Sequence, residues 1–331
     1  MKAFEYAAPK SEREVLDLLS PEWGHTEVLA GGTDLVGLMK QMIVSPQRVV
    51  NLMEVRSLKG IQADSTGVTM GAATTLDDIL DHPALADYPA VTQAIRGINS
   101  MQLQCQGTLG GELCQRPRCW FFRSGLGYLA QNGRLVDQGE NRYHAILGNS
   151  GPAKFVSASR IAPALIALGA SLRIIGSAPK GGQHESVVSA ESLYRIPRHE
   201  GQRELTLAPN EIITHVILPP APLASATYEV RHGEGPDYPL AAAAAALHIE
   251  SGVVRSARIV LGHVAPTPWL SREAGQALLG RTVDEQSASD AGDAAVASAA
   301  PLSHNEYKVQ LARTAVKRAV LLAAGLETGG L

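Results

Sequence analysis

The stretch Leu29-Ala30-Gly31-Gly32-Thr33-Asp34-Leu35 places two glycines between a short apolar strand and a helix with apolar periodicity. Glycine adopts positive φ without steric cost, so successive N–H groups can point into one concavity, and the helix adds its free N-terminal amides. The stretch therefore predicts an anion cradle suited to a pyrophosphate, with the Thr33 hydroxyl as a further donor. Asp34 would repel a phosphate, so we expect it to cap the helix. The alternative is a plain strand–turn–helix connection.

The surrounding pattern is strand, helix, strand, helix, strand over the first fifty residues, which predicts a small α/β layer. Ser11 and Glu14 have the spacing of a capping box before the first helix. A second α/β segment runs to Pro219, where three prolines within five residues indicate a domain boundary. Propensity favours a helix for the six alanines at 241–246, but their flanks also fit a strand packed closely against another layer.

A second glycine-rich loop, Gly107-Thr108-Leu109-Gly110-Gly111, follows about eighty residues after the first. Alone it is a turn, but two such loops in one chain favour a dinucleotide held between two layers. Residues 125–130 also match the pattern G-x-G-x-x-A. That pattern requires a strand before it and a helix after it, and loop composition surrounds it here, so we interpret it as a chance match.

Three cysteines, Cys105, Cys114 and Cys119, lie within fifteen residues. An iron–sulfur cluster and a structural zinc each normally take four ligands, so neither forms here without recruiting a residue such as His144. Packing thiols are the simpler interpretation, and we expect no metal site. Three cysteines also cannot make a disulfide framework in a chain of 331 residues.

The composition excludes several classes of function. A formal net charge of −3 gives no sign of nucleic-acid or anionic-membrane binding. The longest apolar run, residues 240–247, is far shorter than the roughly 20 residues needed to cross a bilayer. The N-terminus shows no secretory signal, so we expect a cytoplasmic protein, with export of a whole complex on a partner's signal left open.

With these loops in hand, the chain resembles the FAD-binding medium subunit of the molybdenum hydroxylases, the xanthine dehydrogenase, carbon monoxide dehydrogenase and aldehyde oxidoreductase family. The resemblance runs over nearly the whole length and is fairly specific, because two glycine loops and a C-terminal match occur together. The motifs that carry it are LAGGTDL at 29–35, MGAATTL at 70–76, GTLGG at 107–111, CQRPRCWFFR at 114–123, HAILGNSGPAK at 144–154, APALIALGA at 162–170, RIVLGHVAPTPW at 258–269 and PLSHNEYKVQLARTAVKRAV at 301–320.

The resemblance implies an α+β chain with a two-subdomain FAD-binding fold of the PCMH type, divided at residues 1–57 and 58–220. A small α/β C-terminal domain with a three-stranded antiparallel sheet would follow at 224–331, with the alanine run as a strand. Such a subunit works beside a molybdopterin-binding large subunit and a small subunit with two two-iron clusters, in a dimer of heterotrimers. Electrons would pass from the clusters through FAD to NAD+, oxygen or another acceptor.

Site residues are carried over by position from the family's motifs. The pyrophosphate would be held by Ala30, Gly31, Gly32, Thr33, Asp34, Leu35, Thr108, Gly110 and Gly111. Thr74 would line the flavin side, and Tyr194 falls near an aromatic residue that covers the isoalloxazine in the family.

Several positions depart from the family's pattern. Glu112 replaces an Asn, Gln104-Cys105 an Arg-Asn pair, Ala158-Ser159-Arg160 a Pro-Ser-Asp segment that helps bind FAD, and Val230 a Lys. A carboxylate near a diphosphate weakens binding unless it turns away or is neutralised, while Arg160 can contact a phosphate itself. Some relatives carry a four-iron cluster whose first ligand matches Cys119, but the other ligands are missing between Leu126 and Glu140, so we expect no cluster.

Three functions stay open at this point. The first is an electron-transfer flavoprotein subunit, and the second is a flavin-free scaffold that keeps the fold to assemble the same type of complex, which Glu112 and Arg160 favour. The third is a free-standing flavin oxidase, for which the sequence offers no acid or base constellation. Bound flavin separates the first from the second, and a copurifying complex separates the third from both.

Overall fold

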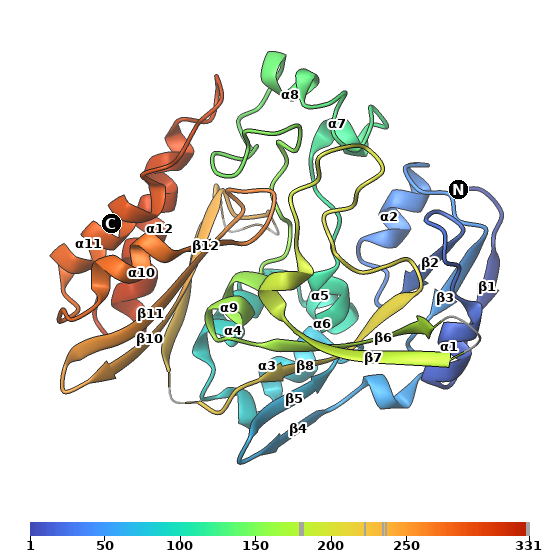
Figure 1. Cartoon of the computed structure of the whole chain (residues 1–331), viewed down its shortest axis with the longest axis horizontal. Helices are drawn as coiled ribbons and strands as arrows, with labels where there is room; N and C mark the ends of the chain where they lie inside the picture. Colours follow the sequence, from blue (N-terminus) through green and yellow to red (C-terminus); the bar gives the residue numbers. More distant parts are fainter. Residues whose placement is uncertain (179–181, 222, 234, 236, 329–331) are drawn as a thin grey trace.

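The computed structural model describes residues 1–178, 182–221, 223–233, 235 and 237–328. Its strands form three sheets, which follow one another along the chain (Figure 1). Within the described residues, no helix combines the length and the apolar character needed to cross a membrane.

The first sheet is parallel, with the order β1-β3-β2, and confirms the alternating pattern predicted for the first fifty residues. Ser11 caps the first helix by accepting a hydrogen bond from the Glu14 amide. The Glu14 carboxylate accepts from the Lys10 amide rather than from the amide of Ser11, so only half of the expected capping box forms. The elements are β1 (Glu5–Ala7), α1 (Glu12–Leu18), β2 (Thr26–Leu29), α2 (Leu35–Lys40) and β3 (Arg48–Asn51).

The second sheet is antiparallel throughout, with the order β4-β5-β8-β6-β7. Its strands are β4 (Ile61–Asp64), β5 (Gly67–Gly71), β6 (Ser171–Ala178), β7 (Gly182–Ser189) and β8 (Glu211–Leu218). The helices between them are α3 (Leu76–Asp81), α4 (Pro89–Arg96), α5 (Met101–Gln106), α6 (Leu109–Leu113), α7 (Trp120–Arg123), α8 (Arg134–Gln138) and α9 (Ala162–Ala167). Short 3-10 helices lie at Arg56–Leu58, Pro83–Leu85 and Ala190–Leu193.

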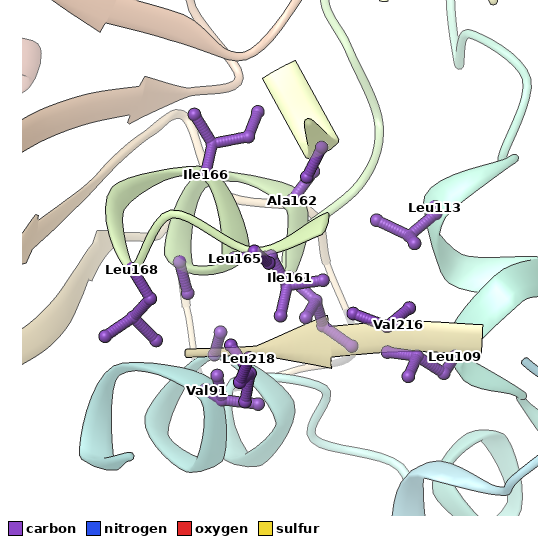
Figure 2. Packing of buried hydrophobic residues seen from close by; sticks show 14 of the residues in the cluster. Val91, Leu109, Leu113, Ile161, Ala162, Leu165, Ile166, Leu168, Val216 and Leu218 are labelled. Atoms are coloured by element: carbon purple, nitrogen blue, oxygen red, sulfur yellow. The ribbon is translucent and has the colours of Figure 1, made fainter. Parts of the chain in front are cut away.

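Alternate residues of β6 and β8 belong to different hydrophobic clusters. Ile174 and Ile213 join the cluster formed with α3, α4, α6 and α9, whereas Ile175 and Ile212 join the cluster of the first subdomain. Figure 2 shows Val91 of α4, Leu165 of α9 and Leu218 of β8 gathered in the first of these clusters. Because successive side chains of a strand point to opposite faces, this sheet connects the two clusters.

The C-terminal sheet has four strands, in the order β12-β11-β10-β9, and this corrects the expectation of three. The extra strand is short and pairs antiparallel with β11 through three residues, Ile259, Val260 and Leu261. The elements are β9 (Ala224–Val230), β10 (Ala241–Glu250), β11 (Val253–Gly262), β12 (Trp269–Ser271), α10 (Arg272–Leu278), α11 (Glu285–Val296) and α12 (Tyr307–Ala323). The three helices cover the outer face of this sheet (Figure 1).

The six alanines form the first part of β10, which confirms the strand interpretation. All six are buried, and their two faces pack on different neighbours. Ala244 and Ala246 belong to the cluster formed with α4 and α9, whereas Ala241, Ala243 and Ala245 belong to the core beneath α12. Small side chains on both faces therefore allow α9 and α12 to approach the same strand closely. The register of β10 on β11 shifts once, at a bulge between His248 and Ile249.

Candidate functional site: a cleft between two glycine loops

The main cleft lies where the first and second sheets meet. Its walls come from the loop after β2, from the end of β5 and the start of α6, and from residues 203–213 leading into β8. Most of the predicted site residues line it, namely Ala30, Gly31, Gly32, Thr33, Asp34, Leu35, Thr108, Gly110 and Gly111. The structure thus brings together two loops that are far apart in the sequence.

The two glycine loops lie against each other. A Cβ atom on Gly31 would stand only 1.7 Å from the carbonyl oxygen of Gln106, so no other residue fits there without moving the backbone. Gly32 has φ of +74°, in the left-handed region that favours glycine. On the other side, a Cβ on Gly110 would meet Ala72 Cβ at 2.9 Å. Both loops therefore need their glycines to form the cleft.

The two loops differ in what their amides offer. The amides of Gly31, Gly32, Thr33 and Asp34 have no hydrogen-bond acceptor among the described residues. In the second loop the amides are already used: Leu109 and Gly110 donate to the carbonyls of Thr74 and Ala72, and Gly111 donates to Thr108 Oγ1. The first loop can therefore bind an anion through its free backbone amides. The second loop has no free amide at Leu109, Gly110 or Gly111, and its glycines instead leave room for a ligand to come close to the backbone.

Asp34 has a different role from the one predicted. It occupies the N-cap position of α2 but makes no side-chain cap hydrogen bond. Its carboxylate instead accepts from Arg123 Nη2 at 2.8 Å and from the Arg116 amide at 2.9 Å, and lies 3.3 Å from Arg118 Nη2. The arginines neutralise the carboxylate beside the free amides, so Asp34 does not oppose an anion there.

Two further ion pairs in the cleft were not predicted from the sequence. Arg116 Nε lies 2.6 Å from Glu204 Oε1, and Arg203 Nη2 lies 2.9 Å from Glu27 Oε1. The Arg203 guanidinium also stacks over Trp23, 3.8 Å from the ring centroid. The partners are 88 and 176 positions apart, so no local pattern could have indicated them.

Glu112 and Arg160, the two replacements expected to disturb flavin binding, are partners and do not line the cleft. Glu112 Oε1 accepts from the Arg160 amide at 2.7 Å, and Glu112 Oε2 accepts from Gln115 Nε2. The Arg160 guanidinium donates to the carbonyls of Gly97 and Asp237 and lies 3.8 Å from the Glu229 carboxylate. Glu112 therefore turns away from the glycine loops, and Arg160 is engaged with the C-terminal domain.

Thr74 and Tyr194 are also not among the residues that line the cleft. Thr74 Oγ1 accepts from the Gly60 amide at 2.9 Å, so this side chain fixes the loop before β4. The Tyr194 hydroxyl donates to the Leu113 carbonyl at 2.9 Å, and its ring packs on the core beneath α9. Tyr194 thus holds the end of α6, and Thr74 contacts the second glycine loop only through its carbonyl, which accepts from the Leu109 amide.

The three cysteines are separated. Cys105 is exposed on α5, Cys114 lines the cleft, and Cys119 lies with its Sγ 3.2 Å from His144 Nε2. Burial raises the pKa of Cys114 to about 12, so it is a neutral thiol in the cleft wall. Among the described residues, no group of three or more His, Cys, Asp and Glu side chains is placed to hold a metal ion.

Comparison with known proteins identifies the family to which this architecture belongs. The family model described as "FAD binding domain in molybdopterin dehydrogenase" matches residues 2–221, and the one described as "CO dehydrogenase flavoprotein C-terminal domain" matches residues 226–323. The chain belongs to this family of FAD-binding oxidoreductase subunits.

Individual relatives extend over nearly the whole chain. It is 29% identical to the carbon monoxide dehydrogenase medium chain of Afipia carboxidovorans over 325 residues, which cover 96% of each chain. It is 30% identical to the FAD-binding subunit of an aldehyde oxidoreductase of Escherichia coli, over 95% of this chain and 96% of that one. The structure of carbon monoxide dehydrogenase from Oligotropha carboxidovorans superposes with a TM-score of 0.76 at 25% identity, over 98% and 99% of the two chains.

Membership of the family makes FAD the cofactor, and the cleft fits it on structural grounds. The free amides of Gly31 to Asp34 suit a diphosphate, the glycines leave room for its approach, and Asp34 is neutralised by arginines. The chain is thus a medium-type FAD subunit of the molybdenum hydroxylases, as the resemblance indicated.

Proposed function

We propose that this chain passes electrons from the iron–sulfur clusters of a partner subunit, through FAD, to NAD+, oxygen or another acceptor. The observation that carries the proposal is the row of free amides from Gly31 to Asp34, opposite the glycines of the second loop. When bound, FAD supplies the one- and two-electron chemistry that no side chain provides. We assign the pyrophosphate to Ala30–Leu35 and to the surface formed by Thr108, Gly110 and Gly111.

The side chains of the cleft hold the binding loops in place. Asp34, clamped by Arg123, fixes the end of the first loop to the segment after α6. Arg116 and Arg203 are each paired with a carboxylate, so the charges of the walls are balanced and the diphosphate meets mainly backbone donors. Glu112, Arg160, Thr74 and Tyr194, predicted by family position to bind the cofactor, do not line the cleft, and in this proposal they act on the flavin only through the segments that they hold.

The scaffold alternative loses its main support in this structure. It rested on Glu112 and Arg160, and neither lines the cleft: Glu112 accepts from the Arg160 amide, and the Arg160 guanidinium donates to the carbonyls of Gly97 and Asp237. A free-standing oxidase would need an unpaired acid or base in the cleft. Among the described residues, four carboxylates line the cleft, and each has a partner: Glu27, Glu204 and Asp34 pair with arginines, and Glu211 contacts His184 and the Ala208 amide.

Substitution of Gly32 tests the flavin site directly. In Gly32→Val the new side chain meets Val36 and Leu29 at 3.1–3.3 Å and forces φ away from +74°, which turns the loop amides. We expect FAD affinity to fall at least about tenfold, because hydrogen bonds to a charged group are lost. The measurement is FAD content, from the flavin absorbance bands and mass spectrometry of the released cofactor.

A matched control is Gly280→Val, because Gly280 has φ of +73° with open space around it and lies in the C-terminal domain. Both variants carry the same backbone strain, and only Gly32→Val should lose FAD. Equal FAD content in the two folded variants would remove the first loop from the site. A folded wild-type chain that rejects FAD would instead favour the scaffold.

The assembly is tested by purification of the native complex. We propose a molybdopterin-binding large subunit and a small two-iron-cluster subunit as partners, in a dimer of heterotrimers. Native mass spectrometry should give two copies of each of three chains, and oxidation of the large subunit's substrate should reduce the flavin and bleach its absorbance band. A chain that purifies alone and is reduced directly by substrate would support the oxidase.

A further inference from the structure

Helix α5 (Met101–Gln106) exposes apolar side chains close to the two glycine loops. None of its six residues is buried; Met101 is 72% exposed and Leu103 38% exposed. Ser100 caps the helix by accepting a hydrogen bond from the Leu103 amide, but neither Met101 nor Leu103 belongs to a hydrophobic cluster of the described residues. A helix this short is marginal in water unless it packs on another surface. A partner that covers α5 would therefore stabilise it.

The C-terminal end of α5 lies against the first glycine loop. The carbonyl oxygen of Gln106 occupies the space that a Cβ on Gly31 would need. The next glycine, Gly32, lies against Val36 of α2, whose side chain is 36% exposed. Exposed apolar side chains thus lie next to the loop whose free amides we assign to the diphosphate. The α5 surface is defined here as Val36, Met101, Leu103 and Cys105, all of which are exposed.

Charge is absent from α5 and concentrated at its edge. No charged residue occurs in the segment 97–111, although 18% of the whole chain is charged. The adjacent helix α3 carries Asp77, Asp78 and Asp81, and no ion pair of the described residues includes any of them. Asp77 Oδ2 lies 3.6 Å from Cys105 Sγ, so the acidic helix borders the α5 surface. An apolar centre with polar and charged side chains at its rim is typical of a protein–protein interface.

We propose that the small subunit with the two-iron clusters docks on the α5 surface. Electron transfer slows steeply with distance, so under the function proposed above, on which this assignment rests, the subunit that delivers electrons docks beside the flavin loops. The unpaired carboxylates of α3 then favour a partner with Lys or Arg side chains around an apolar centre. A second copy of this chain fits poorly, because an isologous contact would bring the acidic helices α3 of two chains together.

Cys105 is a probe of this surface in the unmodified protein. It is exposed, whereas Cys114 and Cys119 are partly buried. Desolvation and the Asp77 carboxylate raise the pKa of the Cys105 thiol, so labelling with iodoacetamide is run at mildly alkaline pH. Because the core of an interface excludes solvent, we expect labelling to be at least about tenfold slower in the native complex than in the FAD-loaded free chain. Equal rates, followed by peptide mass spectrometry, would overturn the proposal.

Photo-cross-linking identifies the subunit that covers α5. Benzoylphenylalanine is incorporated at Gln102, an exposed residue of α5, and the native complex is irradiated. The cross-linked peptide should come from the small subunit. A peptide from the large subunit, or from a second copy of this chain, would overturn the proposal.

Met101→Glu tests the apolar centre of the α5 surface. An unpaired charge is costly to bury, so the variant should bind the small subunit at least about tenfold more weakly, measured by native mass spectrometry on dilution of the complex. Its FAD content should be unchanged, because Met101 does not line the cleft. Met101→Leu should restore binding, and Val187→Glu, at an exposed valine of β7, should leave it unchanged. Equal binding in the wild type and Met101→Glu, or equal weakening in Val187→Glu, would refute the surface.

Flavin content separates this proposal from the function on which it rests. A complex that lacks FAD, but in which the small subunit protects Cys105, would contradict electron transfer and keep the docking surface. A complex whose FAD is reduced by substrate while Cys105 is labelled freely would keep electron transfer and refute the docking surface.

Discussion

Glu112 is a carboxylate that the fold encloses almost completely, 6% exposed and directed at the backbone of Arg160. Burial raises its pKa to about 7, and the nearby Arg160 amide and guanidinium oppose that rise only in part. The position follows directly on the glycines of the second loop, so its charge state bears on the stability of the flavin site. Two changes that each look unfavourable in the sequence thus form one interaction.

The raised pKa of Glu112 predicts a specific pH dependence of stability. The folded chain binds this proton more tightly than the unfolded chain, whose pKa stays near 4.5, so stability falls as pH rises from about 4.5 through about 7. A shift of this size corresponds to roughly 3 kcal/mol. Glu112→Gln keeps an oxygen for the Arg160 amide and removes the titration.

Urea unfolding of wild type and Glu112→Gln across this pH range isolates the effect, because every other titrating group is common to both chains. We expect the wild type to lose stability relative to the variant as the pH rises from about 4.5 to about 7. Below and above this range, the difference between their free energies of unfolding should stay constant. Parallel stability curves would show that Glu112 titrates normally.

The glycine loops could be located from the sequence because local chemistry defines them. Gly32 needs a positive φ and Gly31 a missing Cβ, and both requirements are visible as glycines after a strand. Asp34, by contrast, was expected at a helix cap and is bound by Arg123, 89 positions away. Thr74 and Tyr194 were carried over by position, and their hydroxyls point to partners that no motif reveals.

At the scale of elements, β10 is the most demanding strand, because both of its faces are buried. Ala244 faces the FAD-binding core, where no space is left for a larger side chain. Ala244→Leu should destabilise the chain by about 1–3 kcal/mol through overpacking. Ala63→Leu, on the exposed strand β4, should change stability by no more than about 0.5 kcal/mol. Denaturant midpoints compare the two, and equal midpoints would mean that the alanines are not required by packing.

The sequence analysis predicted the three strands of the first sheet and, from the resemblance, the alanine strand, but not the number of strands in the C-terminal sheet. β12 has three residues, and its place in the sheet depends on pairing with β11 rather than on its own periodicity. Short strands carry too little alternation to be detected locally. The alanine run is the reverse case: its local signal is strong but favours a helix, and tertiary packing on two faces overrides that preference.

At the scale of the whole molecule, the FAD-binding region and the C-terminal domain share a buried boundary. Alternate alanines of β10 belong to two cores, and Arg160 binds the Asp237 carbonyl across the same boundary. We expect the chain to unfold in one transition. Far-ultraviolet circular dichroism and tryptophan fluorescence should give the same urea midpoint, and two separated midpoints would show that the domains are independent.

The uniformity of β10 also raises a question of alignment during folding. Within six identical residues, a slip of two positions puts another alanine in most positions of the run and keeps each on its original face. Such a slip would displace one part of the molecule against the other by about 7 Å, because each strand residue advances roughly 3.4 Å. The run itself carries no positional information, so the correct alignment must be read from its ends. Leu247 and the bulge at His248–Ile249 are the marks that distinguish one alignment from the next.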